Sequence, residues 1–306
     1  MSMEPLTVQQ EERILTEIGY SRDQLKSDLK DLREWMANQH HFPPSAHEET
    51  DIFYSNFLVG SKGSMETAKK KLDMYYSLRE KGDVFTDRGN PAYLDANRES
   101  VTIANLEKND PDGSRIYLAK LTNPEKLSPL IYFKAVVMFF EHRLRRDGIL
   151  GREIYILDAR GLSMSHVLLI PPSAFRSWIT FFLEVYPLRV KKIIVANTPS
   201  VVAAAINNLF LPLVSKKIKE RYIISKDSVE KNVDFVHLLP KDYEGGQGKQ
   251  LETLGDEWCE ALKRTQRELK DRFQEEVDED KRPKLNGFVS NPHFGLHGSI
   301  KTLVID

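Results

Sequence analysis

Short strand-like segments alternate with long helical segments in the middle of the chain, and this alternation constrains the fold more than any other feature. The segments at 115–121, 153–159 and 191–197 ("RIYLAKL", "EIYILDA" and "KKIIVAN") are rich in Ile, Val and Tyr, which is typical of β-strands. A fourth strand is expected at 221–225. Helical crossovers join parallel strands, so the sequence predicts an α/β domain with a mostly parallel sheet.

The two helical segments between these strands are unusually apolar. Residues 129–144 are apolar nearly all round, which indicates a helix buried on more than one side. Residues 171–187 ("PPSAFRSWITFFLEVYP") add further Phe, Trp and Ile side chains. These residues are also consistent with an ordinary core, but together they offer enough apolar wall for a ligand cavity of about 300–1,000 Å³.

The flanking regions of the chain have different patterns. Residues 8–82 are predominantly helical, with apolar residues on one helix face between Leu25 and Met36 and an N-cap at Ser64. We expect three parts: an N-terminal three-helix domain at 1–90, the α/β domain at 91–250, and a C-terminal helix with an extended tail at 251–306.

Composition excludes several classes of protein. The 306 residues carry a formal net charge of −1, so any electrostatic partner has to be held by a local patch. A single cysteine, Cys259, excludes an intramolecular disulfide and a cysteine-based metal site, and fits a reducing compartment. The start lacks the pattern of a secretory signal, and no apolar run reaches the roughly 18 residues of a membrane span. We expect a cytoplasmic protein that binds no nucleic acid.

Catalytic motifs are absent from the sequence. No dinucleotide-binding G-x-G-x-x-G, P-loop or G-x-S-x-G elbow follows a strand. Asp158 ends a strand, where we expect it to bond the following loop, and His166 has no second metal ligand at a suitable spacing. Cys259 lies in an amphipathic helix, as a packed thiol does. We therefore predict no catalytic residue, no metal and no cofactor other than a bound lipid.

Apolar residues lie directly beside a cluster of cations in "NNLFLPLVSKKIKER", residues 207–221. Between Arg189 and Arg221 there are seven basic residues and one acid, Glu220, which gives a local net charge of +6. Basic residues near an anionic bilayer contribute about 1 kcal/mol each. A solvated helix end would also explain the cations at 216–221. It would not explain those at the start of the strand at 191–197.

The order and spacing of several segments resemble the CRAL-TRIO lipid-binding family, in its group of α-tocopherol transfer protein-like and retinaldehyde-binding protein-like members. The segments are "GREIYILDARGLSMSHV", "YPLRVKKIIVANTPSVV" and "LPKDYEGG". The N-terminal "LREWMANQHHFPP" and "AKKKLDMYYSLRE" look like the family's companion helical domain, and the ending "FGLHGSIKTLVID" looks like the arthropod branch.

The resemblance implies a cavity that has the sheet as its floor and is closed by a mobile helix at 200–219. Val201, Phe210 and Leu211 are then lid residues. The predicted ligand-binding residues are Phe133, Val136, Val137, Phe140, Ile154, Ile156, Phe175, Ile179, Phe181, Phe182, Leu183, Ile193, Val195, Val202, Ile206 and Leu209.

The resemblance also assigns a role to the cations. The positions of Arg189, Lys191, Lys217 and Arg221 match residues that bind phosphoinositide headgroups in the family. With two neighbours they complete the predicted membrane-binding set. The set is Arg189, Lys191, Lys192, Lys216, Lys217 and Arg221. The chain departs from the family's arginine-rich segment at Asn56 and Val59, which puts tight phosphoinositide binding in doubt.

The cargo is suggested by one substitution. Family members that carry phosphatidylinositol usually have "YPER", whereas this chain has "YPLR" with Leu188. This favours a hydrophobic cargo of the tocopherol, retinoid or carotenoid class, transferred between membranes when the lid opens on an anionic or phosphoinositide-containing membrane. A lipid sensor or scaffold in signalling, a phosphatidylinositol or phospholipid carrier, and an enzyme on an α/β fold are the alternatives.

Overall fold

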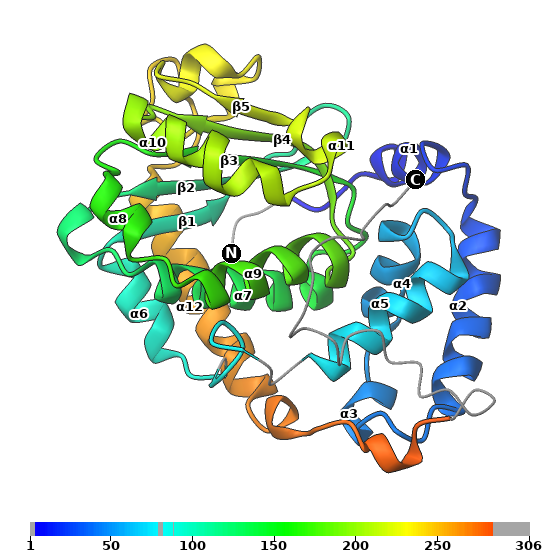
Figure 1. Cartoon of the computed structure of the whole chain (residues 1–306). Helices are drawn as coiled ribbons and strands as arrows, with labels where there is room; N and C mark the ends of the chain where they lie inside the picture. The colour runs from blue at the N-terminus through cyan, green and yellow to red at the C-terminus, as the bar shows by residue number, and fades with distance from the viewer. Residues whose placement is uncertain (1–3, 79–81, 88, 284–306) are drawn as a thin grey trace.

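The computed structural model describes residues 4–78, 82–87 and 89–283. The helices of the N-terminal part lie to one side of a five-stranded sheet, and later helices pack against the sheet (Figure 1). The predicted α/β class with an N-terminal helical region is confirmed. Among these residues, no helix is both long enough and apolar enough to span a bilayer.

The N-terminal helices begin where short polar side chains cap them. Thr7, Ser21, Thr50 and Ser64 each accept a hydrogen bond from a backbone amide in the first turn, as N-cap residues do. The predicted cap at Ser64 is confirmed. The helices are α1 (Val8–Thr16), α2 (Arg22–Ala37), α3 (Pro44–His47), α4 (Asp51–Gly60) and α5 (Met65–Ser77).

The sheet has the order β1-β2-β3-β4-β5, in which β1 is antiparallel to β2 and the other pairs are parallel. The predicted mostly parallel sheet is therefore confirmed, but the edge strand β1 was not predicted. Its sequence "VTIAN" is only five residues long and includes two polar residues, so its strand signal is weak. The strands are β1 (Val101–Asn105), β2 (Arg115–Leu121), β3 (Arg152–Asp158), β4 (Arg189–Ala196) and β5 (Tyr222–Ile224).

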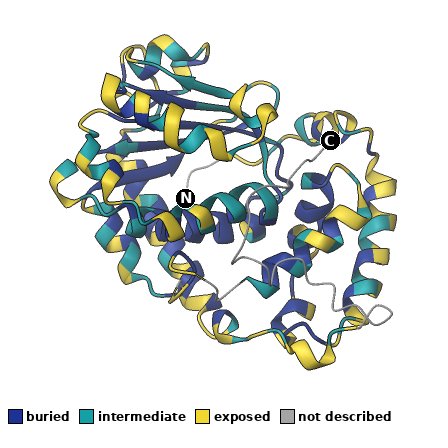
Figure 2. Cartoon of the chain, viewed as in Figure 1, coloured by how far each residue is buried: buried dark blue, intermediate teal, exposed yellow. Residues whose placement is uncertain are grey.

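Helix α7 is the centre of the molecule. It lies beneath the sheet with α9 beside it (Figure 1). Nearly its whole length is buried (Figure 2), so the predicted burial of the helix at 129–144 on more than one side is confirmed. Ser128 caps its start, and Pro129 occupies the first turn, where no amide bond is lost. The helices of this part are α6 (Ala92–Arg98), α7 (Pro129–Arg146), α8 (Met164–Leu168), α9 (Pro172–Thr180), α10 (Ser200–Ala205), α11 (Lys216–Lys219) and α12 (Leu251–Leu269).

The helical region and the α/β region are joined by close contacts. Gly60 at the end of α4 lies so near Pro187 that an added Cβ would be 2.2 Å from the Pro187 carbonyl oxygen. Lys71 on α5 donates hydrogen bonds to the carbonyl oxygens of Glu184 and Tyr186. These contacts fix the helical region against the end of the helix that follows α8.

After α12 the chain returns to the N-terminal helices (Figure 1). Arg272 forms an ion pair of 3.2 Å with Glu48, and the Glu275 carboxylate accepts a hydrogen bond of 2.9 Å from the Ser45 amide. The predicted extended tail is described only as far as residue 283. Residues 284–306, including the ending compared with the arthropod branch, lie outside the described residues.

Candidate functional site

An apolar cavity of about 220 Å³ lies between one face of the sheet and the helices beneath it. Its floor contains one row of residues in register across four strands: Tyr117, Tyr155, Ile193 and Tyr222. Residues directly opposite one another in neighbouring strands point to the same face, so this row is continuous. The sheet therefore presents a largely aromatic surface to the cavity.

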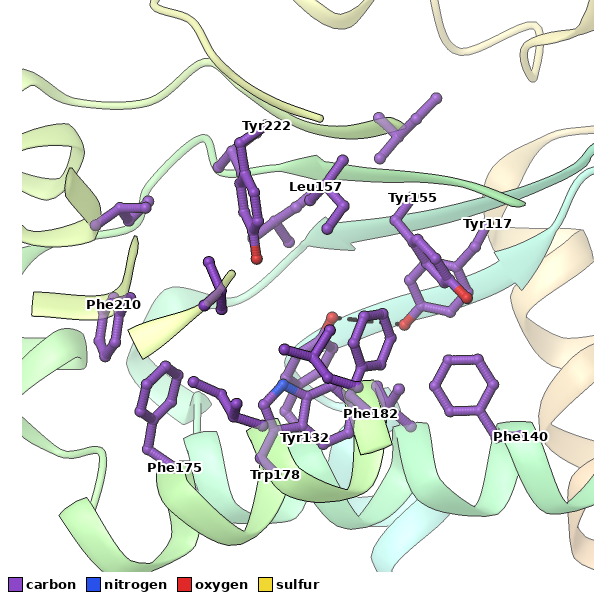
Figure 3. A pocket seen from close by; sticks show the side chains of 18 residues that line it. Tyr117, Tyr132, Phe140, Tyr155, Leu157, Phe175, Trp178, Phe182, Phe210 and Tyr222 are labelled. Carbon is purple, nitrogen blue, oxygen red and sulfur yellow. Dashed lines mark hydrogen bonds between the residues drawn. The ribbon is translucent and has the colours of Figure 1, made fainter. Parts of the chain in front are cut away.

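The helical wall of the cavity is also aromatic (Figure 3). Phe175, Trp178 and Phe182 project from α9 and from the π-helical turn η2 (Phe181–Val185) that continues it. The Trp178 ring stacks near Phe182 at a centroid distance of 5.5 Å, and Phe175 lies 4.3 Å from Phe210. Helix α7 contributes Tyr132, Val136 and Phe140.

No charged side chain lines the cavity among the residues that the structure describes. The polar atoms in the wall are the hydroxyl groups of four tyrosines and the indole nitrogen of Trp178. Burial raises the pKa of Tyr222 to about 12 and raises the pKa of Tyr132, so both hydroxyls stay protonated at neutral pH. Such a site can hold an uncharged, mainly apolar molecule.

Most of the predicted ligand-binding residues line this cavity, together with the predicted lid residue Phe210. They come from α7, α9 with η2, strands β3 and β4, and the segment after α10. They are Val136, Phe140, Ile156, Phe175, Ile179, Phe182, Leu183, Ile193, Val195 and Ile206.

The other predicted ligand-binding residues do not line the cavity, and this part of the prediction is corrected. Phe133, Val137 and Phe181 are buried in the core on other faces of their helices. Ile154 is buried in the core and is absent from the lining of the cavity. The remaining two, Val202 and Leu209, belong to the lid segment.

Several lining residues were missed by the sequence analysis. They are Tyr117, Tyr132, Tyr155, Leu157, Val214 and Tyr222, and Trp178 had been noted only as part of the apolar wall. The tyrosines were not predicted because tyrosine has a polar hydroxyl and is only intermediate in how often it is buried. The alternation in "EIYILD" could have identified Tyr155 and Leu157 as one face, but only the pairing shows which face meets the cavity.

The lid segment, residues 200–219, is not the single helix that we predicted. It consists of α10, the π-helical turn η3 (Ile206–Phe210), the 3₁₀ turn η4 (Leu211–Leu213) and the short α11. Pro212 lacks an amide hydrogen and cannot continue an α-helix, and Ser215 caps a new one. π-Helical turns such as η3 and η2 are rare and occur often at functional sites.

The predicted lid residues have different environments. Phe210 lines the cavity, but Val201 is 52% exposed, and Leu211 is half-buried outside the wall. Val202 is fully buried in a separate small cluster with Val167 and Ala205 that attaches α10 to α8. Leu209, predicted to bind ligand, is 53% exposed.

Large apolar side chains are exposed around the lid segment. Leu168 and Leu169 are 76% and 59% exposed at the end of α8, which packs against α10. We use the name exposed apolar patch for these two residues and three exposed residues of the lid segment. The patch is Leu168, Leu169, Val201, Leu209 and Leu213.

The predicted membrane-binding cations are not one free cluster. Arg189 pairs with Glu17 at 2.7 Å, and Lys191 pairs with Asp110 at 3.0 Å and Asp112 at 2.7 Å. The local charge of +6 therefore overstates the free positive charge, because these acids come from distant parts of the chain. Lys192 alternates with Ile193, which faces the cavity, and so belongs to the opposite face of the sheet.

A smaller group of cations remains near α11. Lys216 and Lys217 are exposed, and Arg221 donates a hydrogen bond to the Val190 carbonyl oxygen. Lys62, in the loop between α4 and α5, lies beside Lys217. The pKa of Lys62 is lowered by the charge of Lys217 and, to a smaller degree, by burial and the more distant arginines.

Lys62 was not predicted, because in this segment only Asn56 and Val59 were compared with the arginines of the family. Asn56 proves to be structural: its side-chain amide donates to the carbonyl oxygens of Leu144 and Gly148, and its oxygen accepts from the Leu150 amide. We call Lys62, Lys216, Lys217 and Arg221 the basic group.

The residues considered for catalysis have structural roles. Asp158 accepts hydrogen bonds from Asn197, from the Arg160 amide and from Tyr243, as expected of a residue that fixes its loop. His166 caps α8 through Ser163. Cys259 is buried, and burial raises the pKa of its thiol. Within the described ranges, no cluster of three His, Cys, Asp or Glu side chains is placed to hold a metal.

Comparison with known proteins finds two family models that match different parts of the chain. Residues 100–245 match the family model of the CRAL/TRIO domain, and residues 21–91 match that of the Pinta-like UBA domain. The chain therefore contains a CRAL/TRIO domain, the domain of a family of lipid-binding and lipid-transfer proteins.

The particular relatives are distant. The chain is 24% identical over 235 residues to the human and Pongo abelii proteins called alpha-tocopherol transfer protein-like, and 23% identical to the mouse protein of that name. These alignments cover 74% of this chain and 66% of each relative. The crystal structure of Sfh5 aligns with 82% of this chain and 99% of its own, at 13% identity and a TM-score of 0.43.

Proposed function

We propose that this protein carries a small hydrophobic lipid of the tocopherol, retinoid or carotenoid class between membranes. The observation that carries the proposal is the cavity itself, whose wall combines nine aromatic residues with no charge among the described residues. The CRAL/TRIO domain and the alpha-tocopherol transfer protein-like relatives support the same function. We propose no catalytic step, metal or further cofactor.

The cavity also gives a physical reason for binding. Enclosed voids in protein cores cost about 24 cal/mol per Å³, so apolar space beneath the lid segment favours being filled. Burying an apolar ligand contributes about 25 cal/mol for each Å² removed from water. Filling the cavity therefore stabilises the folded protein, and the ligand is captured mainly by the hydrophobic effect.

We further propose that the lid segment opens at an anionic or phosphoinositide-containing membrane. The exposed apolar patch and the basic group both include parts of the segment from α10 to the start of β5. Apolar side chains there can enter the acyl region while the cations bind lipid phosphates. A cytoplasmic protein of this kind would associate with membranes reversibly.

A vesicle transfer assay tests the proposed function. Donor vesicles contain retinol or α-tocopherol with a quencher, and acceptor vesicles contain phosphatidylcholine with or without phosphatidylserine or a phosphoinositide. We expect the protein to accelerate transfer, and to do so more strongly with the anionic acceptors. Stoichiometric binding without faster transfer would instead support the alternative of a lipid sensor or scaffold. Absence of both binding and transfer would refute the proposal.

A phospholipid carrier is the second candidate, and one observation disfavours it. The cavity volume of about 220 Å³ is below the ~300–1,000 Å³ that is typical even of sites for drug-sized ligands. Each proposed cargo therefore requires the lid segment to move, and a two-chain phospholipid requires the larger displacement. Extraction of the purified protein followed by mass spectrometry separates the candidates, since a co-purified phospholipid would support the second one.

A further inference from the structure

Two tyrosines place their hydroxyl groups close together in the wall of the cavity (Figure 3). Tyr117 projects from β2 and Tyr132 from α7, and their oxygens lie 3.5 Å apart. A hydrogen bond between hydroxyl groups is normally about 2.7–2.8 Å long, so this one is weak. Within the described chain, neither hydroxyl has another hydrogen-bond partner.

The other polar groups of the cavity differ from this pair. The Tyr155 hydroxyl already donates to Glu153, a buried carboxylate that also pairs with Arg143. Tyr222 lies on β5, three strands away from Tyr117, and its hydroxyl has no nearby hydroxyl partner among the described residues. Tyr117 and Tyr132 are therefore the one position in the described wall where two incompletely bonded hydroxyls converge.

We propose that Tyr117 and Tyr132 form a polar anchor that holds one uncharged hydroxyl or carbonyl oxygen of the ligand. The cavity then takes an alcohol, aldehyde or ketone and discriminates against the corresponding carboxylate. This inference rests on the proposed function and specifies the chemistry of its ligand.

The chemistry of the wall gives the reason for this selectivity. A phenol can both donate and accept, so an oxygen between the two hydroxyls can bond to both of them. Burial raises the pKa of both phenols, which therefore remain neutral. A carboxylate at the same place would be buried with no cation in the described wall, which is costly.

Retinol, retinal and retinoic acid test the anchor because they share one skeleton and differ at the oxygen. Trp178 in the wall reports binding through quenching of tryptophan fluorescence. We expect retinol and retinal to bind the wild-type protein at least about tenfold more tightly than retinoic acid. Tyr117→Phe and Tyr132→Phe should each weaken retinol binding about fivefold, because each removes one hydrogen bond and keeps the ring.

Tyr93→Phe is the matched control, since it removes a tyrosine hydroxyl that lies outside the cavity and bonds Asp87. It should change retinol affinity by less than about twofold. Near-ultraviolet circular dichroism would verify that each variant remains folded. Equal binding of the three retinoids, or a loss with Tyr93→Phe but with neither other variant, would overturn the anchor and leave the carrier function standing. Failure of all three retinoids to bind, together with no transfer, would overturn both.

Discussion

The two ends of α7 lie in different environments inside the protein. The N-terminal part, as far as Phe140, lines the cavity with Tyr132, Val136 and Phe140 and contributes little charge. The C-terminal part carries Glu141 and Arg145 into a buried ionic network between α7 and the N-terminal helices. One helix therefore supports both a hollow apolar region and a filled polar one.

The ionic network is densely bonded. Arg145 pairs with Glu141 at 2.7 Å and with Glu49, which precedes α4. Glu141 also accepts hydrogen bonds from Tyr75 at 2.5 Å and Tyr186 at 2.7 Å. Burial disfavours the charge on Arg145, but the surrounding acidic groups outweigh it and hold its pKa well above the ordinary value.

This difference suggests a division of roles. A network in which two buried carboxylates share one guanidinium permits few arrangements, so it fixes how the helical region sits on the α/β region. An aromatic cavity has no such ionic bonds, and its lid segment contains a π-helical turn and exposed apolar residues. We expect the network to determine stability and the cavity to determine binding. The following experiments test that separation.

The largest effect is expected from Arg145→Met. Removing this cation leaves the Glu49 and Glu141 carboxylates buried without their partner, which typically costs about 3–5 kcal/mol. Urea unfolding measures the change. Arg146→Met is the control, because Arg146 is the next residue but forms an exposed pair with Glu268 that contributes less than about 1 kcal/mol. Equal destabilisation by the two variants would contradict the role of the network.

Acidification should destabilise the protein through His142, which faces α12 from the C-terminal part of α7. Burial lowers the pKa of His142 from 6.5 to about 4. The unfolded chain therefore binds the proton more readily, and stability falls as the pH drops from about 6.5 to about 4. One pH unit of difference corresponds to 1.36 kcal/mol, so the contribution is about 3 kcal/mol.

Urea unfolding at pH 7 and pH 4.5 measures this contribution. His142→Gln should reduce the loss of stability between the two conditions, because glutamine does not titrate. His237→Gln removes an exposed histidine and should leave the pH dependence as it is in the wild-type protein. An unchanged pH dependence in His142→Gln would show that this group stays unprotonated in both states or is not buried.

Substitutions at two adjacent valines of α7 compare a position that borders the cavity with a position that is packed in the core. Val136→Phe adds volume toward the cavity, so we expect a loss of retinol binding of more than about tenfold with little change in stability. Val137→Phe adds the same volume to a fully packed position and should destabilise the protein by about 1–3 kcal/mol. Binding and unfolding are measured on both variants. A destabilisation by Val136→Phe as large as that by Val137→Phe would show that the space is already filled by side chains.

The smallest effects are expected at the basic group. Lys62→Ala and Lys217→Ala remove cations that lie side by side, at about 1 kcal/mol each for an anionic surface. Sedimentation with phosphatidylserine vesicles should show a several-fold weaker association, and retinol affinity should not change. Lys231→Ala, at an exposed position after β5, serves as the control. Membrane binding that is insensitive to Lys62 and Lys217 would exclude this group as the docking site.

Local patterns in the sequence were sufficient for most elements. The strand β2 and the helix α7 were predicted almost to their ends, because residue type and period 2 or 3.6 depend only on neighbouring positions. The break in the lid segment at Pro212 could also have been predicted, since proline acts locally. We missed it because the resemblance suggested a single helix.

The amino-acid sequence by itself determined the alternation of strands and helices, and it placed apolar residues against cations near 207–221. Only the tertiary structure decided that Val136 borders a cavity while Val137 is packed, because a void depends on how distant elements fit together. It likewise decided that Lys191 is paired, since Asp110 and Asp112 approach it from about 80 residues away. Cavities and ion pairs are long-range properties, and local periodicity contains no information about them.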